Sequence, residues 1–267
     1  MNKPEILRAV AGERRNLIAL LRTLDAEQWE IEVLPGWRPR EVAAHVIRLD
    51  ITSLTGSLLP IAFRNNMARL ERWNDDQVPK WANRPTADLL TGLDRWGRRF
   101  LRLARTVPAP AYRLRVPTLW GKAPAGLLIW SRAFDEWVHR HDIRRALGMP
   151  DEEVDVAPAA EFVLTAAISE TVAKMAGQRG RVAISLEGVR LPEWEFDIEA
   201  GRGGPVGSLD GDTPHDEPDA RLTLPAHSFV IAATGRDSFE DLRSDGTLQV
   251  EGDEALAESF LSKLRIV

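Results

Sequence analysis

The sequence predicts a mixed fold class, an antiparallel four-helix bundle followed by a small α+β domain. Three observations support this prediction. Apolar residues recur at helical spacing through the first half of the 267-residue chain, and apolar and polar residues alternate in short segments of the second half. Charge also divides between the halves: residues 1–150 hold 25 Lys and Arg against 16 Asp and Glu, net +9, and residues 151–267 hold 10 against 24, net −14. We therefore expect two domains, 1–150 and 151–267.

Four amphipathic helices are expected in the first half. Their approximate ranges are 4–24, 40–61, 89–103 and 125–147. Pro39 suits the first turn of the second helix, and Gly148 followed by Pro150 is typical of the end of the fourth. A long connection is expected over 74–85. Four helices of this length predict a bundle.

The second half alternates between two patterns. Helical spacing covers 159–176, 226–234 and 255–264, and strand-like alternation covers 182–189, 194–200, 220–224 and 247–252. A loop rich in Gly, Asp and Pro is expected over 201–218. These elements predict an α+β domain.

Composition excludes several classes of protein. With 44% hydrophobic and 28% charged residues, the chain is neither disordered nor of low complexity. Its 0 Cys exclude a disulfide framework, a thiolate nucleophile and a Cys-ligated metal, so any thiol chemistry needs a thiol from outside. No secretion signal or membrane span is recognisable, and no nucleic-acid motif accompanies the basic half, so we expect a cytoplasmic monomer without membrane or nucleic-acid partners.

Histidines and carboxylates suggest a metal site. In the fourth helix Asp135, His139 and Asp142 share one face because residues at i, i+4 and i+7 lie on the same side. A carboxylate and a histidine one turn apart, joined by His45 from the second helix, are typical of a divalent-metal site inside a bundle. Three protein ligands leave a coordination position open for water or substrate. A surface ion pair and a histidine satisfied within the core are the alternative interpretations of the same spacing.

Two segments carry a family resemblance. LPGWRPREVAAHVIRLD (34–50) and FDEWVHRHDIRRALG (134–148) resemble motifs of the DinB-like, mycothiol-dependent maleylpyruvate isomerase superfamily, and the second half is similar to its sterol-carrier-like domain. The resemblance implies His45, Asp135 and His139 as metal ligands. That pattern usually has Glu where Asp135 stands, so Glu136 is an alternative. We favour Asp135 because Glu136 lies about 100° further round the helix.

Other residues also have expected roles, of which only that of Arg236 comes from the resemblance. Asp142 or Glu41 would orient a ligand imidazole, and His141 would serve helix packing or the surface. Arg236, in the sequence Thr234-Gly235-Arg236, would act in catalysis by helping to bind an acidic thiol or substrate. The alternative interpretation of Arg236 is a charged residue that ends a helix.

The implied function is a metal-dependent enzyme that uses a thiol. It would hold a divalent metal, Zn²⁺ being expected, and use mycothiol or a similar low-molecular-weight thiol on a small electrophilic substrate, as an S-transferase or cis–trans isomerase. The alternative is a non-catalytic, metal-stabilised protein that binds a lipid or another small molecule. Two further motifs are rejected: 201–207 lacks the Lys-Ser/Thr of a phosphate loop, and Asp210-Gly211-Asp212 lacks the glycine and glutamate of a calcium loop.

Overall fold

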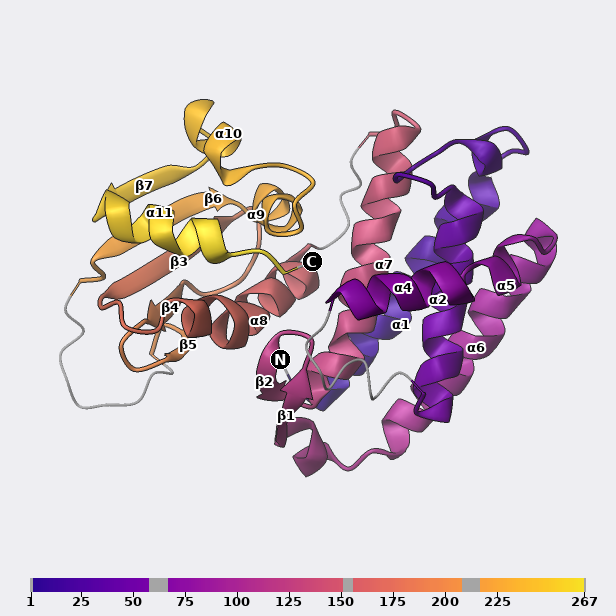
Figure 1. Cartoon of the computed structure of the whole chain (residues 1–267), viewed down its shortest axis with the longest axis horizontal. Coiled ribbons are helices and arrows are strands. Elements are labelled where there is room, and N and C mark those ends of the chain that lie inside the picture. The colour runs from indigo at the N-terminus through magenta and orange to yellow at the C-terminus, as the bar shows by residue number, and fades with distance from the viewer. Residues whose placement is uncertain (1, 58–66, 151–155, 208–216, 267) are drawn as a thin grey trace. The chain divides into compact units, whose positions relative to one another are not determined.

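The chain divides into two compact units, Met1–Val154 and Asp155–Val267 (Figure 1). The computed structural model describes residues 2–57, 67–150, 156–207 and 217–266. The first unit is mainly helical and the second contains a sheet covered by helices, which confirms the mixed fold class and its order along the chain.

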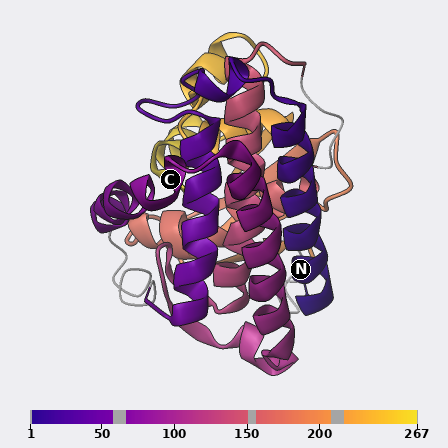
Figure 2. The same cartoon turned by 90° about the vertical axis from the view of Figure 1, so that its right-hand side faces the viewer.

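Long helices dominate the first unit. α1 packs along α6 and α7, α2 packs along α6, and Figure 2 shows these helices beside one another. Two 3₁₀ helices, Gln28–Glu30 and Ala109–Arg113, and a hairpin of β1 and β2 complete it. The elements are α1 (Lys3–Thr23), α2 (Pro39–Thr55), α4 (Met67–Gln77), α5 (Pro79–Ala82), α6 (Thr86–Thr106), β1 (Arg115–Thr118), β2 (Gly121–Pro124) and α7 (Gly126–Ala146).

Local sequence signals explain where the helices begin. Asn2 caps α1 through a reciprocal pair, because the Glu5 backbone N–H donates to Asn2 Oδ1 and the Asn2 backbone N–H donates to the Glu5 carboxylate. In α2 the Glu41 carboxylate accepts from the Arg38 backbone N–H at 2.9 Å, and Pro39 occupies the first turn. Apolar faces of α1, α2 and α6 then meet in one buried cluster that includes Leu17, Ile47 and Leu93.

Two predictions for the first unit were wrong in detail, and one element was not foreseen. α2 ends at Thr55, earlier than expected, because Gly56 takes a left-handed conformation (φ 72°) that stops the helix. The expected connection 74–85 instead contains the end of α4 and all of α5, and the β1–β2 hairpin was not foreseen. The large apolar residues of α4 are Met67, Leu70 and Trp73, a stripe too short to have revealed the helix.

The second unit is a five-stranded sheet in the order β5-β4-β3-β6-β7. β3 and β6 are parallel, with Val182 opposite Ala220, and the other neighbours are antiparallel. α8, α9 and α11 pack against the sheet. The elements are α8 (Ala157–Lys174), β3 (Arg181–Glu187), β4 (Trp194–Asp197), β5 (Arg202–Pro205), β6 (Ala220–Pro225), α9 (Ala226–Ala233), α10 (Phe239–Ser244), β7 (Gln249–Gly252) and α11 (Glu254–Lys263).

The glycine-rich segment at the start of the expected loop forms an edge strand. Residues 202–205 pair with β4, and a Cβ on Gly203 would lie 2.8 Å from Phe196 Cδ1 and 3.2 Å from Ile168 Cγ1. Glycine is therefore required here for close packing rather than for phosphate binding. The Asp210-Gly211-Asp212 motif and His215 lie outside the described residues.

Four phenylalanines fill the core of the second unit. They are fully buried, and the rings of Phe196 and Phe260 have centroids 5.1 Å apart. The four are Phe162, Phe196, Phe229 and Phe260. Among the helices of the described residues, none has the length and apolar content that crossing a bilayer requires.

Candidate metal centre

A tight turn before α2 places an aromatic wall. Pro35 and Gly36 occupy the middle of this turn, in which the Trp37 N–H donates to the Leu34 carbonyl at 2.8 Å, and Gly36 adopts φ 75°. This positive φ favours glycine, and proline suits the preceding position. Trp37 consequently lies against the imidazoles of His45 and His139, with ring centroids 5.1 and 5.9 Å away.

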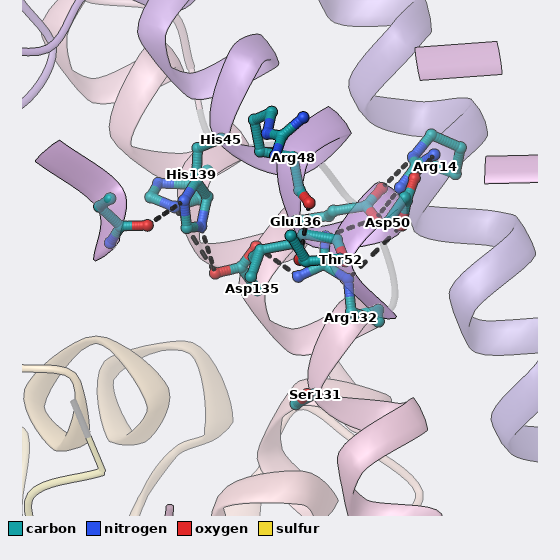
Figure 3. A network of polar contacts seen from close by, with 12 residues as sticks. Arg14, His45, Arg48, Asp50, Thr52, Ser131, Arg132, Asp135, Glu136 and His139 are labelled. Carbon is teal, nitrogen blue, oxygen red and sulfur yellow. Dashed lines mark hydrogen bonds and ion pairs between the residues drawn. The ribbon is translucent and has the colours of Figure 1, made fainter. Parts of the chain in front are cut away.

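His45, Asp135 and His139 converge in space. Asp135 Oδ1 lies 3.4 Å from His45 Nε2 and 3.6 Å from His139 Nε2 (Figure 3). One ligand atom from each residue lies within 4.8 Å of the others. Both imidazoles are buried, whereas the Asp135 side chain is 26% exposed. The donor set of two imidazoles and one carboxylate fits a divalent transition metal that keeps an open coordination position.

The distal nitrogens of both imidazoles face oxygen atoms. His45 Nδ1 donates to Asn74 Oδ1 of α4 at 2.9 Å, and His139 Nδ1 lies 3.3 Å from Asp142 Oδ2. A proton on each Nδ1 leaves the Nε2 lone pair directed at the centre, the form that binds a metal. Of the two carboxylates expected to orient an imidazole, Asp142 is the one beside a candidate ligand, at ion-pair distance and without a hydrogen bond to His139 Nδ1. Glu41 pairs with Arg38 instead.

Arg132 holds the second oxygen of Asp135. Its Nη1 donates to Asp135 Oδ2 at 3.2 Å, so Oδ1 is the atom that faces the imidazoles (Figure 3). The same guanidinium is 3.7 Å from Asp50 Oδ1 and 3.8 Å from Glu136 Oε1. Arg132 is buried, and it connects the candidate ligand to a wider set of buried charges.

That set is centred on Arg14 of α1. Its guanidinium donates to both oxygens of Glu136, at 2.6 and 2.8 Å, to Asp50 Oδ2 at 2.8 Å and to the Leu93 carbonyl at 2.8 Å. Both carboxylates are fully buried. Both carboxylate oxygens of Glu136 accept hydrogen bonds from Arg14. The carboxylate that faces the two imidazoles is that of Asp135.

Electrostatics favours the protonation states of metal ligands. Burial lowers the pKa of His45 although Asp135 opposes the shift, so this imidazole is neutral near pH 7. Burial acts to raise the pKa of Asp135, but His45, His139 and Arg132 together hold it well below its usual range. An anionic carboxylate beside a neutral imidazole is the form in which these groups bind a cation.

Two other predicted residues lie elsewhere. His141 stacks on Trp137, with ring centroids 6.1 Å apart, and does not belong to the cluster. Arg236 is in the second unit, just after α9, where it is half-buried and its Nη1 donates to the Thr234 carbonyl at 3.1 Å. The three candidate ligands all belong to the first unit.

Sequence reasoning missed the supporting residues Asn74, Arg132, Arg14 and Asp50. Arg14 and Asp50 did leave a signal, because each lies four residues after an apolar core residue, Val10 and Val46 respectively. A charged residue in an apolar stripe needs a buried partner. Asn74 left no comparable signal.

The sequence comparison decides the family. Residues 10–144 match the model of the mycothiol maleylpyruvate isomerase N-terminal domain, a span that contains His45, Asp135 and His139. The chain belongs to this family. The resemblance found in the two sequence motifs is thereby confirmed.

Solved structures agree with this assignment at the level of the fold. The mycothiol-dependent maleylpyruvate isomerase is similar with 16% sequence identity and a TM-score of 0.54, over 94% of this chain and 93% of that chain. A point mutant of that isomerase gives 16% identity and a TM-score of 0.55 over the same shares. No curated protein matches the sequence.

Sterol carrier proteins are also among the similar solved structures. Sterol carrier protein 2 from Yarrowia lipolytica aligns with 43% of this chain and 93% of its own, at 15% identity and a TM-score of 0.32. A score this low carries no structural conclusion.

Proposed function

We propose that the protein is a divalent-metal-dependent enzyme that uses a mycothiol-type thiol to isomerise or conjugate a small electrophilic substrate. The observation that carries the proposal is the convergence of His45, Asp135 and His139, whose ligand atoms lie within 4.8 Å of one another. Membership of the mycothiol maleylpyruvate isomerase family supports the thiol. The 0 Cys of the chain agree with a thiol supplied from outside.

Zinc is the metal we propose, because two imidazoles and one carboxylate are a common donor set for catalytic zinc. When bound, the ion would supply Lewis acidity and lower the pKa of a bound water or thiol. The chain's own residues would hold the ligands in place: Arg132 fixes one oxygen of Asp135, and Asp142 approaches His139 Nδ1. Trp37 covers both imidazoles and keeps water from that side.

Three further assignments belong to the same proposal. Arg236 would bind an acidic group of the thiol or substrate, since a guanidinium can pair with a carboxylate through two hydrogen bonds. The helices α1, α2, α6 and α7 would form a DinB-like antiparallel four-helix bundle, which the packing of α1 on α6 and α7 supports. The second unit would be the sterol-carrier-like domain.

Metal content is the first test. The protein is purified without a metal-affinity tag, incubated with zinc, desalted and measured by elemental analysis. About one ion per chain is expected, with loss in His45→Ala and in Asp135→Asn. His141→Ala is the matched control, because His141 lies two residues from His139 on the same helix but stacks on Trp137. A folded wild type that takes up no zinc would contradict the proposal.

Activity is the second test. Zinc-loaded protein is incubated with maleylpyruvate, or with other small electrophilic acids, in the presence and absence of mycothiol, and products are followed by absorbance and mass spectrometry. Thiol-dependent turnover that disappears in Asp135→Asn is expected. Isomerised product identifies an isomerase, and a stable thiol adduct identifies a transferase. Full activity of metal-stripped protein would contradict the proposal, and thiol-independent binding of a lipid without turnover would favour the binding-protein alternative.

A further inference from the structure

The two imidazoles of the candidate centre are held in different ways. His139 Nδ1 faces Asp142, which lies three residues later on the same helix. His45 Nδ1 instead meets Asn74 Oδ1 at 2.9 Å, a residue that belongs to α4 and not to α2. The orientation of His45 therefore depends on a contact between two helices, whereas that of His139 is local to α7.

The contact between α4 and α2 is polar. None of the side chains of residues 68–77 is fully buried, and the large apolar side chains among them, Leu70 and Trp73, are half-buried. Side-chain hydrogen bonds join the helices: His45 Nδ1 donates to Asn74 Oδ1, and Arg48 Nη2 donates to Gln77 Oε1 at 2.5 Å. The donors are three residues apart on α2 and the acceptors are three residues apart on α4, so the bonds lie about one turn apart along both helices.

We propose that Asn74 is a positioning residue for His45, and that its hydrogen bond couples metal binding at the centre to the docking of α4 on α2. The inference rests on the proposed function, because it requires the metal site. Asn74 has no role in the chemistry itself. It acts through the His45 ring, by holding Nδ1 in its protonated form and so directing the Nε2 lone pair at the position that a metal would share with Asp135.

Coupling follows from the same bond. A cation at Nε2 draws electron density from the ring and makes Nδ1–H a stronger donor, so the bond to Asn74 strengthens when metal binds. Binding free energies are reciprocal. If metal binding makes the docking of α4 more favourable, the docking of α4 makes metal binding more favourable by the same free energy. Gln77 lies on the same face of α4 and helps to dock the helix, but it contacts Arg48 rather than a candidate ligand.

The test compares four proteins: wild type, Asn74→Ala, Asn74→Asp and Gln77→Ala. Zinc affinity is measured by competition with a chromophoric chelator, and the spectrum of the cobalt-substituted protein reports the ligand geometry. Asn74→Ala should weaken zinc binding about 10–100-fold, the usual effect of losing a partner that orients a ligand. Asn74→Asp, which keeps an acceptor oxygen, should bind at least as tightly as wild type. Gln77→Ala should bind as wild type does, with an unchanged cobalt spectrum.

Hydrogen exchange tests the coupling. Amide protection in α4 should increase when zinc is added to wild type and to Gln77→Ala, and should not respond to zinc in Asn74→Ala. Equal zinc affinity in wild type and Asn74→Ala overturns the inference while leaving the proposed function standing. Equal weakening by Gln77→Ala and Asn74→Ala also overturns it, because Asn74 would then act only by docking the helix. A wild type that binds no zinc overturns both proposals together.

Discussion

The two units of the molecule bury different kinds of side chain. The first unit surrounds Arg14 with the carboxylates of Asp50 and Glu136, whereas the second fills its core with four phenylalanine rings. Among the described residues of the second unit, Glu195 is the one buried residue with a charged side chain. The second core is of the ordinary apolar kind, which gains free energy from burial without requiring particular bond directions.

This difference indicates what the charged core is for. Burying an ion pair often stabilises a protein less than an apolar core of the same volume would, because both ions lose their hydration. Hydrogen bonds are directional, however, and they join Arg14 to Glu136 and Arg132 to Asp135. Between these two pairs, Glu136 and Arg132 form an ion pair at 3.8 Å. The first unit thus gives up part of its stability and in return fixes the direction of one carboxylate at the candidate centre.

Replacing Arg14 should give the largest effect. Arg14→Leu leaves two fully buried carboxylates without their main partner, and the free energy of unfolding of the first unit should fall by about 3–5 kcal/mol. Urea denaturation followed by tryptophan fluorescence measures this, since every tryptophan except Trp194 lies in the first unit. Arg15→Leu is the control, because Arg15 is exposed and should change stability by less than about 0.5 kcal/mol. A loss of under about 1 kcal/mol for Arg14→Leu would show that the charges do not support the core.

A comparable loss of stability is expected for a substitution in the core of the second unit, with no change in the zinc affinity of the first unit. Phe260→Ala removes a fully buried ring and should cost about 3–5 kcal/mol. Hydrogen exchange should quicken in β3 and β6, while α7 and the zinc affinity of the first unit stay as in wild type. Weakened zinc binding in Phe260→Ala would mean that the two cores are not independent.

Gly97 tests the space that the charged core needs. A Cβ at this position of α6 would lie 2.0 Å from Arg14 Nη1, so Gly97→Ala should destabilise the first unit by about 1–3 kcal/mol. The cost should fall in an Arg14→Leu background, and a double-mutant cycle measures the difference. Gly12→Ala in α1 is the control: its Cβ meets nothing nearer than Arg15 Nη2 at 3.9 Å, so it should stabilise the helix by about 0.5–1 kcal/mol. Additive costs at Gly97 and Arg14 would contradict the packing argument.

The smallest effect concerns an ion pair at the edge of the first unit. Burial acts to raise the pKa of Glu41, but hydrogen bonds from Arg38 outweigh it and the net pKa is lowered from 4.5. A lowered carboxyl pKa adds stability above 4.5 and loses it as pH falls through the folded-state value. Glu41→Gln should therefore cost about 0.2–1 kcal/mol near neutral pH, because Arg38 is partly exposed. The difference in free energy of unfolding between Glu41→Gln and wild type should disappear in acid. A difference that grows in acid would contradict a lowered pKa of Glu41.

How much was predictable differs between the two units and the centre. Periodicity located α1, α2, α6 and α7 in the first unit and four of the five strands in the second. The clearest cases are α1 and α6, which bury apolar residues at helical spacing, and β6, in which every second side chain is buried. Periodicity missed α4, whose residues 68–77 have no buried side chain, and β5, whose glycines gave no alternation. The positions of α4 and β5 depend on contacts with other elements, and their own sequences carry no clear periodic pattern.

At the centre, spacing and family motifs selected His45, Asp135 and His139, and the structure brings these three together. From the sequence, Glu136 remained an alternative to Asp135 as the carboxylate ligand. The structure shows that the Glu136 carboxylate contacts Arg14, a residue 122 positions away in the chain. Arg132 and Asn74 contact candidate ligands through tertiary structure. No local pattern distinguishes such an arginine or asparagine from one exposed to solvent.

The separation of the candidate ligands along the chain has a consequence for folding. His45 and Asp135 are 90 residues apart in sequence, so an ion bound to both would close a long loop, as a disulfide does in a secreted protein. Closing a loop of that length with a covalent link removes about 4–5 kcal/mol of chain entropy from the unfolded state. The chain has no Cys, so a chelator would destabilise its fold much as a reducing agent destabilises a disulfide-bonded protein. The stability of the first unit would then depend on the supply of zinc, as that of a disulfide-bonded protein depends on redox conditions.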